Sequence, residues 1–230
     1  MNPRTKLNSR PAFLLSAGCA LCFAAAAYAA VQEFSGFLRF GTTVERIQQI
    51  NADTPTGLST SSMAMVLNDC SRAVTYARSL EFRYLGEQAT RTIFEVCEAK
   101  VGAITALSPT NSLAWLTSAR LAGQSGNLER LNSDLANSRL VAPNEQWLAD
   151  LRIELAETYL SDLSAENRAG HDQDLRLMII SGVGLGKMAA RYIRHEDFRD
   201  RITAIVETVP AFNQNKFINS LNRILRNAGY

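Results

Sequence analysis

The N-terminal thirty residues constrain this chain most, because they join a basic tip to a long uncharged apolar run. Arg4, Lys6 and Arg10 are the only charged residues among the first ten. The next 21 residues, Pro11 to Val31, carry no charge. A basic tip followed by an apolar block is typical of an export signal. We therefore expect the rest of the chain to leave the cytoplasm.

Two fates are open to this segment. The core 12–23 has the length of a signal-peptide core, and Ala27-Tyr28-Ala29 forms an A-x-A site that predicts cleavage after Ala29. An uncleaved anchor is the alternative, since 21 residues at about 1.5 Å each can cross a hydrocarbon core of about 30 Å. Either fate predicts a periplasmic body, soluble after cleavage or held at the inner membrane with the basic tip inside.

The charge of the exported body is nearly balanced. The whole chain has 24 Lys and Arg against 22 Asp and Glu, and three of the basic residues lie in the N-terminal tip. Residues 31–230 therefore hold 21 basic and 22 acidic side chains, a net charge of −1. A nucleic-acid-binding protein normally carries a concentrated basic excess. We expect no nucleic-acid partner.

The pattern beyond residue 62 predicts an all-α fold, because apolar residues recur at spacings of three and four. Ser108-Pro109 and Ala142-Pro143 predict helix ends, since proline cannot continue the hydrogen-bond ladder. Gly126 and Asn127 fit a C-cap followed by an N-cap. The polar run 165–174 predicts a connection. The expected helices are 63–84, 87–107, 112–124, 127–141, 145–163, 174–194, 196–208 and 212–227.

The region before these helices is divided in two. Residues 33–50 contain Phe34, Phe37 and Phe40, which fit either a segment at a membrane interface or, as we favour, a first packing element. Residues 51–62 hold Pro, Gly and six Ser or Thr, which predicts a linker. The expected organisation is therefore 1–31 signal peptide or anchor, 32–62 juxtamembrane segment and linker, and 63–230 helical domain.

A 34-residue spacing separates Pro109 from Pro143. The unit between them, residues 111–145, resembles a tetratricopeptide repeat. The residues at the expected positions of that repeat are Trp115, Ala119, Ala122, Gly126, Ser138 and Pro143. Ser118, Leu131 and Leu135 depart from the family pattern, and the following unit, with Trp147, is out of phase. The resemblance implies stacked antiparallel helix hairpins that offer surfaces to protein partners.

The layout is also similar to that of accessory proteins of bacterial envelope polysaccharide assembly. These proteins combine an N-terminal membrane segment with tetratricopeptide-like helices. The resemblance implies a role in the cell envelope.

Two cysteines remain in the body. Cys70 and Cys97 are centred on the turn expected near 83–86, so they would lie at one height on facing helices. In an oxidising compartment this favours a disulfide over two buried thiols. Cys19 and Cys22 have C-x-x-C spacing but lie inside the apolar run, where thiol exchange is not expected.

No motif for chemistry is complete. Ser181 to Met188 resembles a P-loop, but serine replaces the first glycine and methionine the final hydroxyl residue. We expect a helix that packs through Gly182 and Gly186. His171, in the polar run, and His195, at a helix end, have no partners at metal-ligand spacing. The C-terminal helix groups Phe217, Leu221, Ile224 and Leu225 on one face, for core packing or for docking on a partner or membrane.

These observations favour an exported, non-enzymatic helical scaffold or adaptor that binds other envelope proteins, without cofactor, metal or catalytic residues. One alternative is an enzyme acting on an envelope polymer through carboxylates that the sequence does not reveal. Another is a membrane-apposed subunit of a larger complex. In that case the aromatic residues of 33–50 and the C-terminal helix should form one exposed apolar patch.

Overall fold

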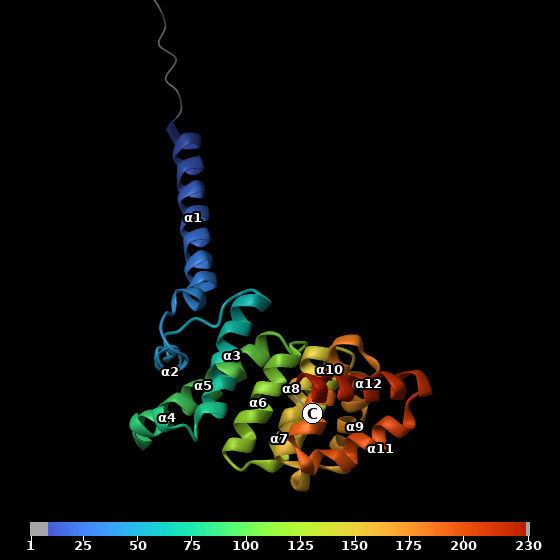
Figure 1. Cartoon of the computed structure of the whole chain (residues 1–230). Helices are drawn as coiled ribbons and strands as arrows, with labels where there is room; N and C mark the ends of the chain where they lie inside the picture. The colour runs from blue at the N-terminus through green and yellow to red at the C-terminus, as the bar shows by residue number, and fades with distance from the viewer. Residues whose placement is uncertain (1–8, 229–230) are drawn as a thin grey trace, which may run out of the picture.

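The computed structural model describes residues 9–228, with side-chain environments from residue 13. Over these residues the chain forms twelve α-helices and three short 3-10 helices, and no strand. The expected all-α class is confirmed. The helices pack in adjacent pairs, and one long helix projects from the body they form (Figure 1).

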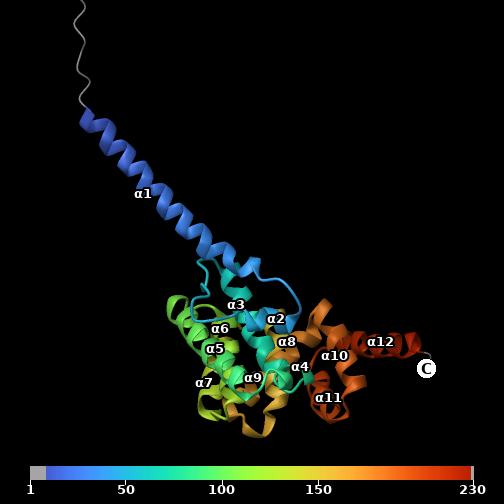
Figure 2. The ribbon, with the colours of Figure 1, turned by 90° about the vertical axis from the view of Figure 1, so that its left-hand side faces the viewer.

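The projecting helix is α1 (Ser9–Phe34). It is apolar on every side, and its large side chains from Phe13 to Phe34 are 60–76% exposed. The segment Phe13–Leu38 is long and apolar enough to cross a membrane, and none of its most apolar window is buried. Two views at right angles show α1 standing clear of the other helices (Figures 1 and 2). This exposure is consistent with a signal peptide or an anchor.

The first half of the body follows directly from α1. Its elements are η1 (Ser35–Leu38), α2 (Thr43–Gln48), α3 (Thr60–Tyr76), α4 (Leu80–Tyr84) and α5 (Glu87–Leu107). Helices α3 and α5 pack on each other and on α6. The expected linker is shorter than 51–62, because the Ser59 hydroxyl accepts from the backbone N–H of Ser62 and so begins α3 at Thr60.

The second half consists of successive helix pairs. These are α6 (Ser112–Gln124) with α7 (Leu128–Val141), α8 (Gln146–Thr158) with α9 (Ala165–Ile180), and α10 (Gly182–Arg194) with α11 (Arg199–Thr208), followed by α12 (Ala211–Asn227). Short 3-10 turns, η2 (Leu160–Asp162) and η3 (Glu196–Phe198), lie inside the second and third pairs. The first helices of the pairs begin at residues 112, 146 and 182. Helix α8 contributes to both main apolar clusters: Leu148 and Leu155 to the first, Ala149 and Ile153 to the second.

The turn between α6 and α7 has the predicted chemistry. Gly126 adopts a φ of 76°, and its N–H donates to the Gly123 carbonyl. The N–H of Asn127 donates to the Ala122 carbonyl at 2.8 Å, which completes a Schellman motif. The Asn127 side chain then accepts from the N–H of Arg130 and begins α7. The expected C-cap and N-cap are confirmed.

The prediction of a connection at 165–174 is wrong. These residues form the first part of α9, which Ser164 caps by accepting from the N–H of Asn167. The polar side chains are buried, with Asn167, His171 and Asp174 no more than 1% exposed. They face charged and polar partners on neighbouring helices, so the buried side of α9 carries no apolar periodicity over this stretch.

Two expected helices are each broken by a serine. The predicted helix 63–84 ends as α3 at Tyr76, and Ser79 caps α4 through the N–H of Phe82. The predicted helix 174–194 is interrupted at Ser181, which caps α10 through the N–H of Gly184. When a serine hydroxyl accepts a hydrogen bond from the backbone N–H three residues later, it favours the start of a new helix over continuation of the preceding one.

Candidate functional site

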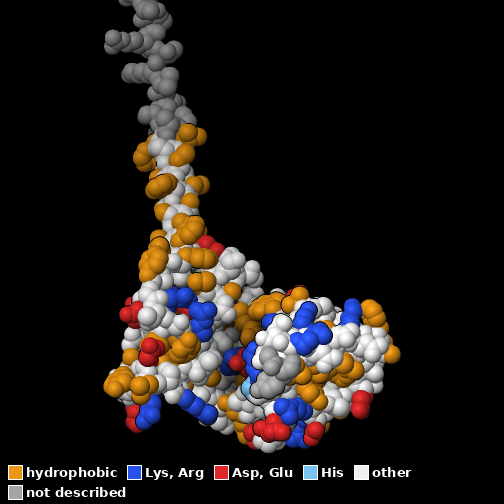
Figure 3. All heavy atoms as spheres, viewed as in Figure 1, with side chains coloured by type: hydrophobic (Ala, Val, Ile, Leu, Met, Phe, Trp, Pro, Cys, Tyr) orange, Lys and Arg blue, Asp and Glu red, His pale blue; other side chains and the backbone are white. Residues whose placement is uncertain are grey.

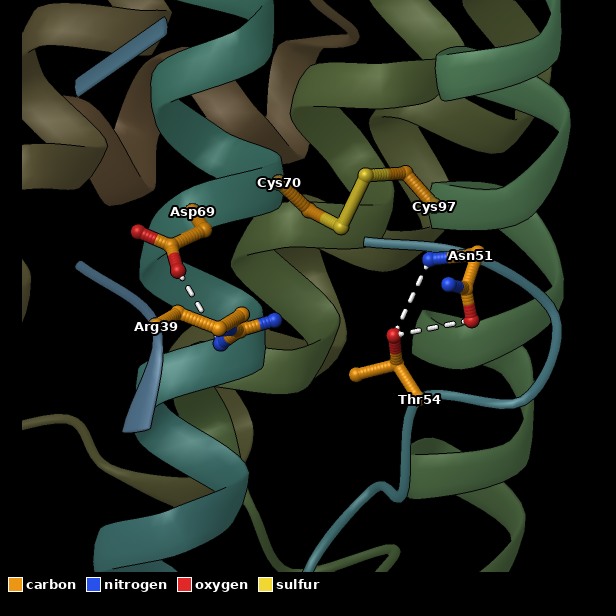
Figure 4. The surroundings of a disulfide bond; sticks show 6 residues. All are labelled: Arg39, Asn51, Thr54, Asp69, Cys70 and Cys97. Atoms are coloured by element: carbon orange, nitrogen blue, oxygen red, sulfur yellow. Dashed lines mark hydrogen bonds and ion pairs between the residues drawn. A yellow bond between two sulfur atoms is a disulfide. The ribbon is translucent and has the colours of Figure 1, made fainter. Parts of the chain in front are cut away.

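The expected disulfide is present. Cys70 of α3 and Cys97 of α5 are bonded, with their Cα atoms 5.5 Å apart, and both are fully buried (Figure 4). They lie within the larger apolar cluster, so the covalent link fastens the first helix hairpin at its core. A disulfide between buried helices is expected in an oxidising compartment, which supports export. Cys19 and Cys22 are exposed, unbonded thiols on α1.

A carboxylate at the end of α1 binds the start of α3. Glu33 accepts from the backbone N–H groups of Leu58 (3.2 Å) and Ser59 (3.0 Å). It also accepts from the hydroxyls of Ser59 and Ser62, the latter at 2.8 Å. A carboxylate is favoured here, because the first N–H groups of a helix lack partners and carry partial positive charge. The end of α1 is therefore held on the body.

A second polar contact lies beneath the segment that follows α1. Asp69 of α3 is fully buried and pairs with Arg39 at 3.0 Å (Figure 4). It also pairs with Arg46 at 2.6 Å. The Arg39 side chain is only 7% exposed. Its burial lowers the pKa of the guanidinium, an effect that the charge of Asp69 opposes. The pair ties the chain after η1 to the middle of α3.

The aromatic residues around this contact are exposed. Phe34 is 60%, Phe37 46% and Phe40 71% exposed, so the packing favoured from sequence does not apply to them. The packing residues of this region come later, at Val44 and Ile47 of α2, which join a small apolar cluster. The aromatic positions alone could not distinguish these roles, because a phenylalanine suits a core and a membrane interface equally.

The residues of unit 111–145, whose sequence resembles a tetratricopeptide repeat, lie mainly on the first helix pair of the second half. Ala119 and Ala122 of α6 and Ser138 of α7 are fully buried where the two helices meet, and the Ser112 hydroxyl donates to the Ser138 carbonyl at 2.7 Å. Trp115 is half-buried, and its indole N–H donates to the Pro109 carbonyl at 2.8 Å. Gly126 forms the turn, and Pro143 is exposed directly after α7.

A buried charge cluster joins this pair to the next. Asp174 of α9 accepts from Arg152 of α8 through Nε (2.9 Å) and Nη2 (2.6 Å), and from Arg139 of α7 at 3.1 Å. Arg152 is completely buried, and its remaining nitrogen donates to the Ala142 carbonyl. Burial lowers the pKa of Arg139, and the charge of Asp174 opposes this. The carboxylate thus connects three helices.

The two histidines differ in their surroundings. His171 was expected in a loop, but it is fully buried on α9, with Nε2 bonded to the Glu157 carboxylate and its ring edge-on to Phe198. Its Nδ1 has no hydrogen-bond partner among the described residues. His195 is exposed directly after α10, so its expected place at a helix end is confirmed.

The glycine-rich start of α10 packs differently from the prediction. A Cβ atom added to Gly182 or Gly186 would meet no heavy atom within 4 Å. At Gly184 the added atom would lie 2.6 Å from the carbonyl oxygen of Met178 on α9. Gly184, and not its two neighbours in the pattern, allows the close approach of α9 and α10.

An open pocket of about 340 Å³ lies where the second and third pairs meet. Trp147, at the start of α8, lines it together with Met178 of α9 and Val183 of α10. Trp147 is 50% exposed and Val183 75% exposed. Nearby, Lys187 of α10 pairs with Asp150 of α8 at 2.7 Å. The out-of-phase tryptophan of the sequence therefore marks an exposed apolar position at a junction between pairs.

A second pocket, of about 420 Å³, lies between the start of α10 and α12. Lys216, Arg223 and Arg226 line it, and no acidic residue does. Helix α12 packs on the body through Phe217, which is buried and meets Tyr192 edge-on at 5.7 Å. Leu221 and Ile224 are half-buried, and Leu225 is 37% exposed. Core packing is thus the role of this face.

Within residues 9–228, no three His, Cys, Asp or Glu side chains are grouped as a metal site requires. No family model, no curated protein and no solved structure matches this chain.

Proposed function

We propose that the protein is an exported, non-enzymatic scaffold that binds other envelope proteins through its paired helices. It works without a cofactor, and the second half of the body has a tetratricopeptide-like arrangement. The first helices of successive pairs start 34 and 36 residues apart, which supports a repeat with a period close to that family's. The order of an N-terminal membrane segment and paired helices, which is similar to that of accessory proteins of envelope polysaccharide assembly, further supports an accessory role in that process.

The observation that carries this proposal is the exposed Trp147 pocket. Tryptophan is enriched at the energetic centres of protein interfaces, because one rigid ring buries a large area and donates a hydrogen bond. Trp147 and Val183 are exposed on two different helix pairs, yet they share one pocket with the buried Met178. A partner side chain entering there would contact both pairs at once.

The partner expected at this pocket has an apolar anchor with polar groups beside it. The apolar wall can take a leucine, methionine or aromatic side chain. Asn144, Gln146 and Lys187 line the same pocket and offer hydrogen-bond donors around it. An interface of this kind combines a desolvated centre with a polar rim.

The test is recovery of the full chain from its native envelope, followed by identification of bound proteins. Trp147→Ala should reduce the recovery of a reproducible partner at least tenfold, because truncating such an anchor typically costs about 2 kcal/mol or more. Leu140→Ala is the matched control, since Leu140 is 80% exposed and lines none of the pockets described here. Recovery without any companion, or a companion that Trp147→Ala leaves unchanged, would count against the scaffold role.

The membrane-apposed alternative expects the aromatic segment and the C-terminal helix to share one patch. The two segments lie apart: η1 contacts α1 and α3, whereas α12 packs on α9, α10 and α11. Both ribbon views show α12 at a distance from the base of α1 (Figures 1 and 2). The aromatic segment therefore needs an explanation of its own.

A further inference from the structure

In the segment that joins α1 to the body, a charged side chain is buried and the large apolar side chains are exposed. Arg39 turns inward to Asp69 and is 7% exposed, whereas its neighbours Leu38 and Phe40 are 64% and 71% exposed. A water-facing surface normally shows the opposite arrangement, with the charge outside and the large apolar residues inside. Phe34, Phe37, Leu38 and Phe40 together form what we call the collar.

The collar is continuous with the apolar surface of α1. Apolar side chains recur along the described part of α1 and continue to the point where the helix meets the body (Figure 3). The collar begins at Phe34, the last residue of α1, and runs through η1. A contiguous exposed apolar patch, rather than scattered single residues, marks a site of contact with a membrane or another protein.

The length of α1 indicates which of these covers the collar. From Phe13 to Gln32 the helix has 20 residues without a charge. At about 1.5 Å per residue this stretch is about 30 Å long, the thickness of a hydrocarbon core. The next residue, Glu33, is already bonded to the start of α3. No slack remains between the apolar helix and the body, so a membrane crossed by α1 would place the collar at its surface.

Two polar contacts hold the collar in this place. Glu33 binds α3 at its first turn, and Arg39 pairs with Asp69 farther along the same helix. The five residues between them, including three of the collar, are thus fixed at both ends. Both charged groups face α3, which leaves the apolar side chains outward. Phenylalanine and leucine fixed in this way suit the zone between lipid headgroups and acyl chains.

We propose that α1 is retained as a membrane anchor and that the collar seats the body on the outer surface of the bilayer. The basic tip would remain inside, and the body with its disulfide would lie outside, so the charge rule and the cysteine chemistry agree on one orientation. The occupant of the collar is the lipid interface. This inference depends on export of the body and not on the adaptor role.

The test uses the full chain in vesicles of phosphatidylethanolamine and phosphatidylglycerol. One environment-sensitive fluorophore is attached at Phe40→Cys, or at Leu140→Cys as the control, with Cys19 and Cys22 replaced by Ser in both. The oxidised Cys70–Cys97 pair does not react with the label. Leu140 is 80% exposed and lies on α7. The helices that chiefly pack on η1 are α1 and α3, so position 140 reports on a different part of the body.

The expected result has two parts. The label at position 40 is quenched by nitroxide-bearing lipid, and its quenching by aqueous iodide is about tenfold weaker than at position 140, because the interface excludes the ion. Equal iodide quenching at the two positions, without lipid quenching at position 40, would overturn the seating of the body. If Phe40→Cys fails to fold, judged by circular dichroism, Leu38→Cys replaces it.

The retention of α1 is tested separately by the intact mass of the chain recovered from the bacterial envelope. We expect the uncleaved mass in the membrane fraction, resistant to alkaline extraction. A mature chain that begins at Ala30 would overturn the anchor. Neither the quenching measurement nor the mass measurement involves a protein partner. Failure of the anchor and collar proposal is therefore distinguishable from failure of the scaffold proposal.

Discussion

Replacing Asp174 with alanine should destabilise the body more than any other single charge removal on α9. Asp174 is 1% exposed and accepts three hydrogen bonds from the guanidinium groups of Arg152 and Arg139. In Asp174→Ala, two arginines that are 0% and 9% exposed lose their only carboxylate within ion-pair distance among the described residues. The Arg152 side chain is 0% exposed and that of Arg139 only 11%, so water can replace little of the lost interaction.

The magnitude follows from the cost of leaving a buried charge without its partner. Removing one member of a buried ion pair typically costs about 3–5 kcal/mol. For a body of this size, each kcal/mol lowers the Tm by about 2–4 °C, which gives a decrease of roughly 6–20 °C. The matched control is Asp172→Ala, two residues earlier on α9. The Asp172 side chain is 46% exposed and, among residues 9–228, forms an ion pair only with Arg201, at 3.0 Å. Its removal should cost about 0–1 kcal/mol.

The assay is thermal and urea unfolding of the full chain in detergent micelles, followed by circular dichroism. Helix α1 adds a constant signal, because it stands clear of the helices of the body (Figure 1). If Asp174→Ala and Asp172→Ala unfold within about 1 kcal/mol of each other, the buried cluster does not stabilise the junction as its geometry implies.

Three further predictions address other parts of the chain. The double variant Cys70→Ser/Cys97→Ser should lose about 3–4 kcal/mol of unfolding free energy, because the disulfide closes a loop with a sequence separation of 27. Urea unfolding without reductant measures this loss, and a change below about 1 kcal/mol would contradict the prediction. Gly184→Ala should lower the Tm, since its Cβ would meet the backbone of α9, whereas Gly186→Ala, with open space around it, should raise stability by up to about 1 kcal/mol. Glu33→Ala should loosen α1 from the body and broaden the distance distribution between spin labels on α1 and α5, and an unchanged distribution would show that the carboxylate does not hold the helix.

Much of the helical architecture was accessible from the sequence. Apolar spacing of three and four predicted the bounds of α5 and α6 to the residue, and proline and glycine chemistry predicted the ends of α6 and α7. These signals are local, since a cap or a helix end involves residues within one turn of each other. The disulfide was also accessible, because one hairpin turn fixes which positions face each other on its two helices.

The tertiary structure decided what local signals could not. The first part of α9 is helical because its polar residues have buried partners on α7 and α8, and these partners are far away in the sequence. Likewise, the sequence left a core and a membrane interface both open for Phe34, Phe37 and Phe40. The structure exposes them, in a segment where Arg39 turns inward to Asp69. Periodicity records which residues avoid water, whereas the choice between a protein core and another apolar environment depends on long-range contacts.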